Sequence, residues 1–192
     1  MEKREKIFLQ TERMVIRDYE KEDLNSHHKL MSDREEMRYL PDIMTHSLEE
    51  SKKDLDEAIA DQENPERKFY FLRMEERETG KLIGEIGYTV LEVTPVGKIV
   101  HLGYYSHKKY WGQGYMTEAL RRVLQFAFEE NHVYRVTTGC NPENAASEKV
   151  MKKCGMIKEA YMKEKCWFEG KMCDRVEYRM LKPEWNRLSG HE

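Results

Sequence analysis

The sequence predicts an α/β domain built around a mixed sheet. Segments rich in β-branched and aromatic residues alternate with segments of helical periodicity, which is typical of a sheet covered by helices. Some strand candidates are joined by short polar turns that contain glycine, which indicates antiparallel hairpins within the same sheet. The 192 residues contain no proline-rich or glycine-rich linker, so residues 1–192 are expected to form a single domain.

The first 106 residues are expected to supply four strands and two helices. Ser47 and Glu50 match a capping box, and apolar residues at helical spacing follow, so a helix should begin there. The polar stretch ERETG should turn the chain between two strands of a hairpin. Gly103 lies inside the last strand, where a glycine often marks a bulge or a close approach by another backbone or a ligand. Strands are expected at 13–17, 68–74, 81–90 and 98–106, and helices at 21–39 and 47–61.

The remaining residues are expected to form two helices and three strands. Apolar residues at helical spacing follow the stretch YWGQG and predict a helix that stops near Asn131. Gly155 stands where a left-handed residue commonly closes a helix. The stretch WFEGK supplies the turn of the C-terminal hairpin. Strands are expected at 133–140, 156–162 and 174–181, and the shorter helix at 145–153.

Two glycines, Gly112 and Gly114, directly precede the long helix. The first turn of a helix has unpaired N–H groups and a partial positive charge, which together bind phosphate. Glycine allows the backbone to approach such a ligand closely, and Lys108 and Lys109 stand just upstream. The pattern lacks the GK[ST] of a P-loop and the third glycine of a dinucleotide fingerprint. It therefore indicates either another kind of pyrophosphate cradle or only a strand-to-helix turn.

A longer run around these glycines resembles a known motif. LGYYSHKKYWGQGYMTEAL is similar to the acyl-CoA-binding motif of GNAT-type N-acetyltransferases, whose core reads [Q/R]-x-x-G-x-[G/A]. Lys109 takes the first position of that core, a departure that keeps the positive charge. The segments NPENAASEKVMKKCGM and LQTERMVIRDYEKEDL resemble two other parts of the family, in the expected order, so the resemblance covers about 9–182. The branch with the ribosomal-protein-alanine acetyltransferases looks most similar.

The resemblance implies a GNAT-like fold, with a central, mostly antiparallel sheet, splayed strands and flanking helices. It implies acetyl-CoA as the acyl donor, and direct attack by an amine through a tetrahedral intermediate. Pantetheine would run between the splayed strands, about 100–105 and 133–139, and a backbone N–H there would stabilise the oxyanion. The cofactor-binding residues implied are Leu102, Gly103, Tyr104, Lys109, Gly112, Gln113, Gly114, Tyr115, Met116, Thr117, Asn144 and Ser147.

The catalytic residues are less directly indicated. Met151 stands at the position where many family members have a tyrosine that protonates the departing thiolate. The resemblance to the ribosomal branch implies that Ser147 takes this role. Alternatively, Ser147 only forms a hydrogen bond to the backbone. His101 stands where relatives often have a glutamate base, and could relay a proton from the amine or be a satisfied strand histidine. Cys166 replaces a later glutamate of the ribosomal branch, and Glu85 is a further candidate if its side of the strand faces the cleft.

The composition limits the classes of partner that the protein is expected to bind. The net charge of -3 and pI near 6.2 give no electrostatic case for nucleic acid or an anionic membrane, so neither is an expected partner. The charged N-terminus does not resemble a signal peptide, and the four cysteines lack metal or disulfide spacing, so a cytoplasmic protein with reduced thiols and no metal is expected. The acceptor, such as a protein N-terminus or a small amine, and the choice of monomer or homodimer stay open. The alternative functions are a non-catalytic CoA-binding sensor and an RNA-binding protein.

Overall fold

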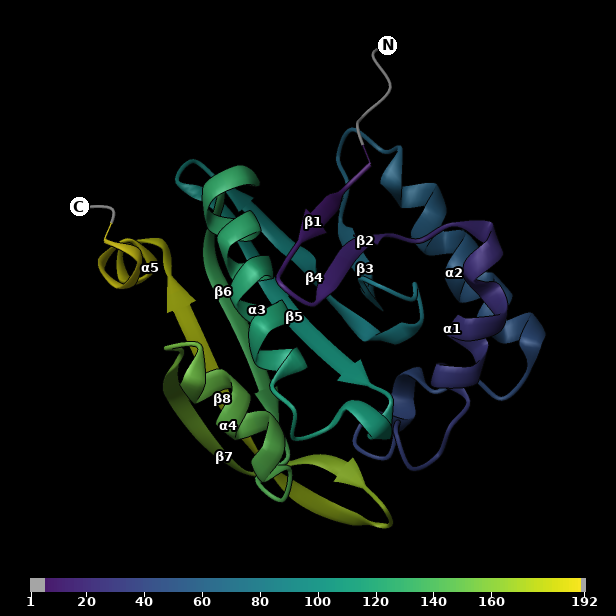
Figure 1. Cartoon of the computed structure of the whole chain (residues 1–192). Helices are drawn as coiled ribbons and strands as arrows, with labels where there is room; N and C mark the ends of the chain where they lie inside the picture. Colours follow the sequence, from purple (N-terminus) through teal and green to yellow (C-terminus); the bar gives the residue numbers. More distant parts are fainter. Residues whose placement is uncertain (1–5, 191–192) are drawn as a thin grey trace.

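A single eight-stranded sheet forms the centre of the molecule (Figure 1). The computed structural model describes residues 6–190. From one edge to the other, the strands are β1 (Phe8–Gln10), β2 (Met14–Asp18), β3 (Phe69–Glu76), β4 (Leu82–Thr94), β5 (Gly97–Ser106), β6 (Val133–Cys140), β8 (Lys171–Leu181) and β7 (Ile157–Phe168). Among the strands of residues 6–190, only the β5–β6 pair is parallel, and the other neighbours are antiparallel. The predicted mixed, mostly antiparallel sheet is therefore confirmed.

Helices cover both faces of this sheet. Helices α1 and α2 lie on one side of it, whereas α3 and α4 lie on the other (Figure 1). The α-helices are α1 (Leu24–Met31), α2 (Leu48–Gln62), α3 (Tyr115–Gln125), α4 (Ala145–Lys153) and α5 (Lys182–Ser189). Short helical turns are η1 (Lys21–Asp23), η2 (Pro41–Ile43), η3 (Lys108–Tyr110) and the π-turn η4 (Phe126–Glu130), which continues α3. None of the helices within residues 6–190 is long and apolar enough to span a membrane.

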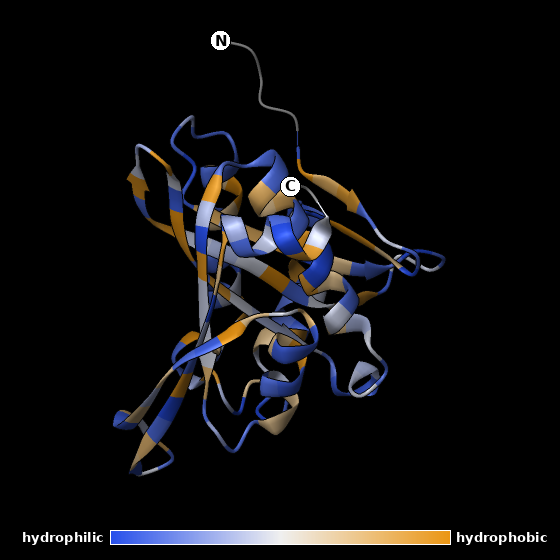
Figure 2. Cartoon of the chain, turned by 90° about the vertical axis from the view of Figure 1, so that its left-hand side faces the viewer, coloured by the Kyte–Doolittle hydropathy of each residue, from blue (hydrophilic) through white to orange (hydrophobic). Residues whose placement is uncertain are grey.

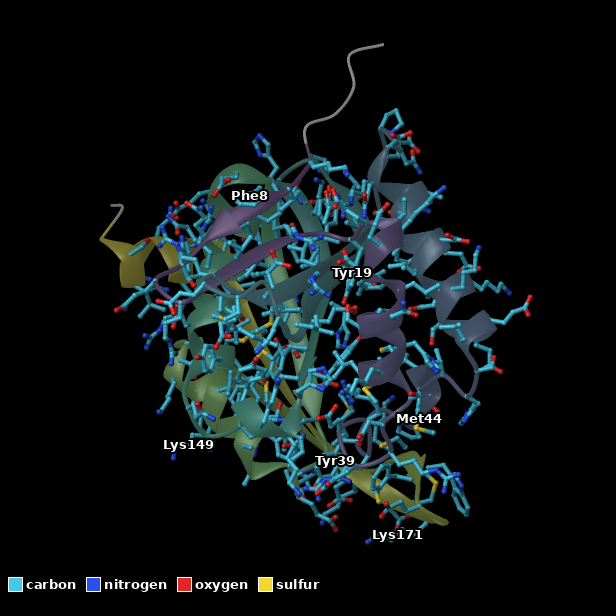
Figure 3. All side chains as sticks on the ribbon, turned by 45° about the vertical axis from the view of Figure 1, so that its right-hand side comes forward. Phe8, Tyr19, Tyr39, Met44, Lys149 and Lys171 are labelled. Atoms are coloured by element: carbon cyan, nitrogen blue, oxygen red, sulfur yellow. The ribbon has the colours of Figure 1, made fainter. Side chains whose placement is uncertain are left out.

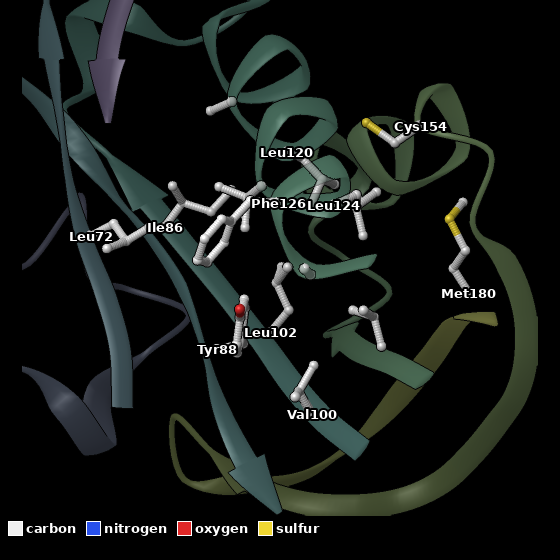
Figure 4. Close-up of a cluster of buried hydrophobic side chains, with 14 of the residues drawn as sticks. Leu72, Ile86, Tyr88, Val100, Leu102, Leu120, Leu124, Phe126, Cys154 and Met180 are labelled. Atoms are coloured by element: carbon white, nitrogen blue, oxygen red, sulfur yellow. The ribbon is translucent and has the colours of Figure 1, made fainter. Parts of the chain in front are cut away.

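The main core lies between α3 and the strands. Leu120 and Leu124 of α3 are fully buried, and Ile86 and Leu102 of the adjacent strands belong to the same cluster (Figure 4). Because residues of a strand alternate between faces, burial of Leu102 in this core directs His101 and Gly103 to the opposite face, toward α1 and α2. Hydrophilic and hydrophobic residues are interleaved along the strands (Figure 2). The core thus fixes which face of β5 remains open for chemistry.

Several element boundaries differ from the sequence prediction. The helix expected at 21–39 ends at Met31. It ends there because the Ser32 hydroxyl donates to the His28 carbonyl, and the Asp33 carboxylate accepts hydrogen bonds from N–H groups of the turn that follows. Strands β4, β7 and β8 are longer than predicted, since polar residues continue the hairpins beyond the apolar stretches. Sequence reasoning missed β1 and α5, and Pro183 lies at the start of α5, where proline suits a helix.

The predicted helix signals are confirmed in two places. Ser47 caps α2 as predicted, its hydroxyl accepting a hydrogen bond from the Glu50 N–H at 3.1 Å. The other half of the capping box differs from the prediction, because the Glu50 carboxylate accepts from the N–H of His46 and not of Ser47. Gly155 follows α4 with φ +79° and donates its N–H to the Lys152 carbonyl. This left-handed residue sends the chain from α4 into β7, as the sequence predicts.

Candidate active site

Strands β5 and β6 diverge in the middle of the sheet. They pair in parallel from Lys98 opposite Val133 to His101 opposite Thr137, and no pairing continues beyond that point in the described chain. Strand β5 nevertheless runs on to Ser106, and β6 to Cys140. The backbone of β5 from Leu102 onward therefore has N–H and C=O groups directed toward the gap, available to an extended ligand lying between the strands.

The two glycines form an open loop at the start of α3. Gly112 and Gly114 have φ of +73° and +86°, the left-handed region that favours glycine. Gly114 is the N-cap of α3, and no side chain of the described residues caps this helix end. A Cβ at Gly112 would meet no described atom within 4 Å. An uncapped helix N-terminus behind an open glycine loop fits a phosphate group.

Polar contacts hold the segment that leads into this loop. The Glu36 carboxylate accepts hydrogen bonds from His107 Nδ1 at 2.7 Å and from the Lys108 N–H at 2.8 Å. Lys108 also pairs with Glu35, so its charge is already engaged. Lys109 lies over the ring of Tyr110, and its carbonyl accepts a hydrogen bond from the side-chain amide of Gln113. Of the two lysines that the sequence singled out, Lys109 is thus the one without an ion pair among the described contacts.

Arg13 supports the glycine loop, although the sequence analysis did not single it out. It lies just before β2, yet its Nη1 donates to the Gln113 carbonyl at 3.0 Å and its Nε donates to Glu118 at 2.7 Å. Its guanidinium also lies 4.0 Å from the centroid of the Tyr115 ring. Because Arg13 is about 100 positions from its partners, no local pattern could pair them. Arg13 fastens the glycine loop to the first turn of α3.

We expect Arg13→Ala to weaken binding of the CoA that the resemblance implies by about 10-fold, equivalent to about 1.4 kcal/mol, since the Gln113 carbonyl and the Glu118 carboxylate would lose their bonds from the guanidinium. Calorimetric titration with CoA measures this change. Arg77→Ala is the matched control, because Arg77 lies on the adjacent β3–β4 turn and is exposed. Equal affinity of the Arg13→Ala variant and the control would show that Arg13 does not support the loop.

The remaining loop residues begin α3. Tyr115 and Met116 pack partly buried against the main core. The Thr117 carbonyl accepts a hydrogen bond from the Cys154 thiol, which ties α3 to the end of α4. These contacts hold the core-facing side of the first turn of α3. Its N-terminal N–H groups remain directed toward the glycine loop.

Ser147 and Tyr104 form a hydroxyl pair across the gap between α4 and β5. Asn144 caps α4, its side-chain oxygen accepting the Ser147 N–H at 3.1 Å. Ser147 Oγ lies 2.9 Å from Tyr104 Oη, which also donates to the Ser147 carbonyl at 3.2 Å. Burial raises the pKa of Tyr104, which keeps its hydroxyl protonated. Met151 is fully buried in the core and has no exchangeable proton to give.

His101 lies on the opposite face of β5, half-buried. Its Nδ1 is 3.3 Å from Thr137 Oγ1, and that hydroxyl donates to the Val100 carbonyl, so Nδ1–H is the donor and Nε2 is the basic nitrogen. Burial lowers the pKa of His101, and the nearby Arg175 lowers it further, while Glu177 raises it. Lowering of the pKa favours the neutral imidazole.

Gly103 and Glu85 lie on the same face as His101. Gly103 is exposed, and a Cβ there would meet no described atom within 4 Å, so this face of β5 is open beside it. Glu85 of β4 lies opposite Tyr105 and is buried, and this burial raises the pKa of its carboxyl group. The register of β4 with β5 therefore places Glu85 on the same face of the sheet as Gly103, which is the face that a base would need to occupy.

Cys166 lies apart from these groups. It belongs to the hairpin of β7 and β8, where its thiol donates to the Cys173 carbonyl within the hairpin. The ring of Phe168, at the end of β7, stacks on Tyr39 of the α1–α2 connection, and Figure 3 shows Tyr39 next to this hairpin, on which Lys171 is labelled. The hairpin and the connection between α1 and α2 therefore meet at one end of the molecule.

Comparison with known proteins gives the fold and the site a family. The family model described as "Acetyltransferase (GNAT) domain" matches residues 13–157. The uncharacterized N-acetyltransferase YnaD of Bacillus subtilis is 31% identical over 183 residues, covering 92% of this chain and 98% of YnaD. The [ribosomal protein uS5]-alanine N-acetyltransferase of Escherichia coli is 29% identical over 85 residues, 44% of each chain. The crystal structure of spermidine N-acetyltransferase from Vibrio cholerae, in complex with CoA and spermine, superposes with a TM-score of 0.79 at 18% identity, covering 91% of this chain and 99% of that one.

The fold combines an eight-stranded sheet, one splayed parallel strand pair and a glycine loop at the start of a helix. The chain belongs to the GNAT acetyltransferase family, and its relatives include ribosomal-protein-alanine acetyltransferases. The family resemblance seen in the sequence is confirmed. The protein is an N-acetyltransferase of this family.

Proposed function

We propose that the protein acetylates a primary amine by direct attack of the amine on the acetyl thioester, within one domain over residues 1–192. The observation that carries this proposal is the divergence of β5 and β6 beside the uncapped, glycine-bordered start of α3. Acetyl-CoA supplies an activated acetyl group, and the protein must hold it, polarise its carbonyl and manage two protons.

The proposal places the phosphates on the glycine loop. Backbone N–H groups of Gly112, Gln113 and Gly114 and of the first turn, Tyr115 to Thr117, hold them, and Lys109 adds a positive charge. The backbone of Leu102, Gly103 and Tyr104 pairs with pantetheine as an added strand, and Asn144 lines the opposite side. A backbone N–H in this stretch of β5 stabilises the developing oxyanion.

The reaction also requires one group that gives a proton to the thiolate and one group that takes a proton from the amine. The Ser147 hydroxyl donates a proton toward the departing thiolate, and the Tyr104 hydroxyl, 2.9 Å away, turns to donate to Ser147 Oγ as negative charge develops on it. A base on the other face of β5 takes the proton of the amine. His101 and Glu85 flank the open position at Gly103 on that face, and both groups are able to accept a proton.

The acceptor in this proposal is a primary amine of a protein N-terminus or of a small molecule. The names of two relatives supply one probe for each class: an alanine-initiated peptide and spermidine. The proposal sets the reaction in the cytoplasm, with the protein a monomer or a homodimer, and the free cysteines suit that reducing compartment.

We expect release of free CoA thiol that depends on both acetyl-CoA and one of the two probe amines, with acetylated amine detected by mass spectrometry. Omission of either substrate is the control for uncatalysed hydrolysis. Saturable acetyl-CoA binding without product from either amine would contradict the proposal and favour the alternative, a CoA-binding module that does not catalyse transfer.

A further inference from the structure

A cluster of buried polar side chains lies between the sheet and the two N-terminal helices. It consists of Tyr19 after β2, His27 of α1, Glu85 of β4, Tyr105 of β5, and Asp54 of α2 at its outer end. Tyr19, His27 and Glu85 are only 1%, 2% and 8% exposed. Figure 3 shows Tyr19 between the strands and α1. Within residues 6–190, His27 Nδ1 is buried without a hydrogen-bond partner, whereas the Tyr19 hydroxyl interacts with the Glu85 carboxylate. Buried polar atoms seldom stay unsatisfied, so His27 Nδ1 indicates a site prepared for a proton, a water molecule or a polar ligand.

His27 connects this cluster to the surface. Its Nε2 lies 3.0 Å from Asp54 Oδ2, and the Asp54 side chain is 48% exposed. A carboxylate accepts hydrogen bonds, so Nε2 carries the hydrogen of the neutral ring and Nδ1 is its basic nitrogen. His27 Nδ1 lies 3.8 Å from Glu85 Oε2, a gap that rotation of the carboxylate closes. An imidazole oriented by a carboxylate, with its basic nitrogen toward a second acid, is an arrangement that transfers protons.

The other end of this path reaches the open face of β5. Glu85 lies opposite Tyr105, and Gly87 lies opposite Gly103, so Glu85 and Gly103 are diagonal neighbours. Diagonal neighbours are separated by about 7–8 Å, within reach of a long side chain. The Glu85 side chain is 11% exposed, which leaves part of it accessible to an acceptor held at Gly103.

We infer that Glu85 takes the proton of the acceptor amine, and that His27 and Asp54 carry this proton to solvent. The inference rests on the proposed function and assigns the base that it requires. The ammonium loses one proton to the Glu85 carboxylate, and the freed lone pair attacks the thioester carbonyl. When the tetrahedral intermediate collapses, the C–S bond breaks, the departing thiolate takes the Ser147 proton, and the second proton of the nitrogen restores the Ser147 hydroxyl. The Glu85 carboxylic acid then protonates His27 Nδ1, and the Nε2 proton leaves through Asp54. Glu85 is the catalytic residue, whereas His27 and Asp54 act through it.

The electrostatic surroundings suit this role. Burial raises the pKa of Glu85, and the positive charge that His27 carries once it has accepted a proton opposes that rise. Burial also raises the pKa values of Tyr19 and Tyr105, so both hydroxyls stay protonated and can donate to the carboxylate. The charged or titratable groups that face the cluster from the neighbouring elements are Tyr19, Asp23, His27, Asp54, Arg73 and Tyr105.

Glu85→Gln should lower kcat about 100-fold, since general base catalysis typically contributes 10²–10⁴-fold. Acetyl-CoA affinity should stay unchanged, and the rising limb of the kcat–pH profile should be lost, because in the wild type activity appears as Glu85 deprotonates. The probe amine is whichever of the alanine-initiated peptide and spermidine the wild type acetylates faster. Wild-type kcat with the limb intact in Glu85→Gln would overturn the inference while leaving the proposed function standing.

Asp54→Asn tests the outer end of the path. It should lower kcat several-fold without changing KM, because His27 loses the carboxylate that orients its ring. Asp56→Asn is the matched control, since Asp56 lies on the same helix, pairs only with Lys52 among the described ion pairs and is 45% exposed. Equal kcat for the Asp54→Asn variant and this control would remove His27 and Asp54 from the path.

Infrared spectroscopy tests Glu85 without any acceptor. The protein should show the band of a buried, protonated carboxyl group that titrates with pH and is missing in Glu85→Gln. Lack of this band at every pH at which the protein is folded would overturn the inference. If both probe amines fail but the band is present, the failure belongs to the proposed function.

Discussion

Gly114→Asp should abolish CoA binding while the protein stays folded. Gly114 is the N-cap of α3, and aspartate is a favoured N-cap residue that also tolerates the left-handed region better than most. Its carboxylate would accept the first-turn N–H groups that the proposed function reserves for phosphate, and would repel that anion. We expect affinity to fall at least about 100-fold, or about 2.8 kcal/mol. Calorimetric titration with CoA measures the loss, and circular dichroism checks the fold.

Gly80→Asp is the matched control for this variant. Gly80 lies in the β3–β4 turn with φ +66°, and a Cβ there would meet no described atom within 4 Å. The control therefore carries the same backbone strain and the same added charge away from α3. CoA binding by Gly114→Asp as tight as that of the wild type would refute the placement of the phosphates on the glycine loop.

Ser147→Ala should lower kcat more than it lowers acetyl-CoA affinity. Without this hydroxyl the departing thiolate has no donor at that position, and loss of a general acid typically costs about 10²–10⁴-fold. Its backbone N–H still bonds to the Asn144 cap, so α4 should remain in place. Steady-state kinetics with each probe amine, together with calorimetric acetyl-CoA affinities, separate the two effects.

Tyr104→Phe distinguishes which hydroxyl donates to the sulfur. If Ser147 is the donor and Tyr104 only polarises it, Tyr104→Phe should lower kcat less than Ser147→Ala does, and the double variant should resemble Ser147→Ala. Unchanged kcat in Ser147→Ala would reduce Ser147 to a structural residue of α4. A larger loss in Tyr104→Phe than in Ser147→Ala would instead make Tyr104 the proton donor.

The sequence predicted most of the fold because its elements have local signals. The Ser47 cap, the apolar stripe of α3 and the glycine after α4 each act within a few residues. The helix expected to reach residue 39 stops at Met31, because side chains of Ser32 and Asp33 bond to nearby backbone instead. Strand β1 has three residues and exists through its pairing with β2, so no local pattern predicts it.

The site was predictable only where it depends on backbone conformation. Gly112 and Gly114 have the left-handed angles that their position in the sequence implies. The contacts of Arg13, the hydroxyl pair of Ser147 with Tyr104, and the approach of His27 to Glu85 join residues between 43 and 105 positions apart. Tertiary structure creates these pairs, and a single sequence gives no local signal for them.

The glycine loop as a CoA site is the claim on which the other assignments depend, and calorimetric titration of the wild-type protein with acetyl-CoA tests it most directly. The account predicts saturable binding at one site per chain, with competition by CoA and loss in Gly114→Asp. A folded wild-type protein that gives no saturable heat with acetyl-CoA would contradict the account.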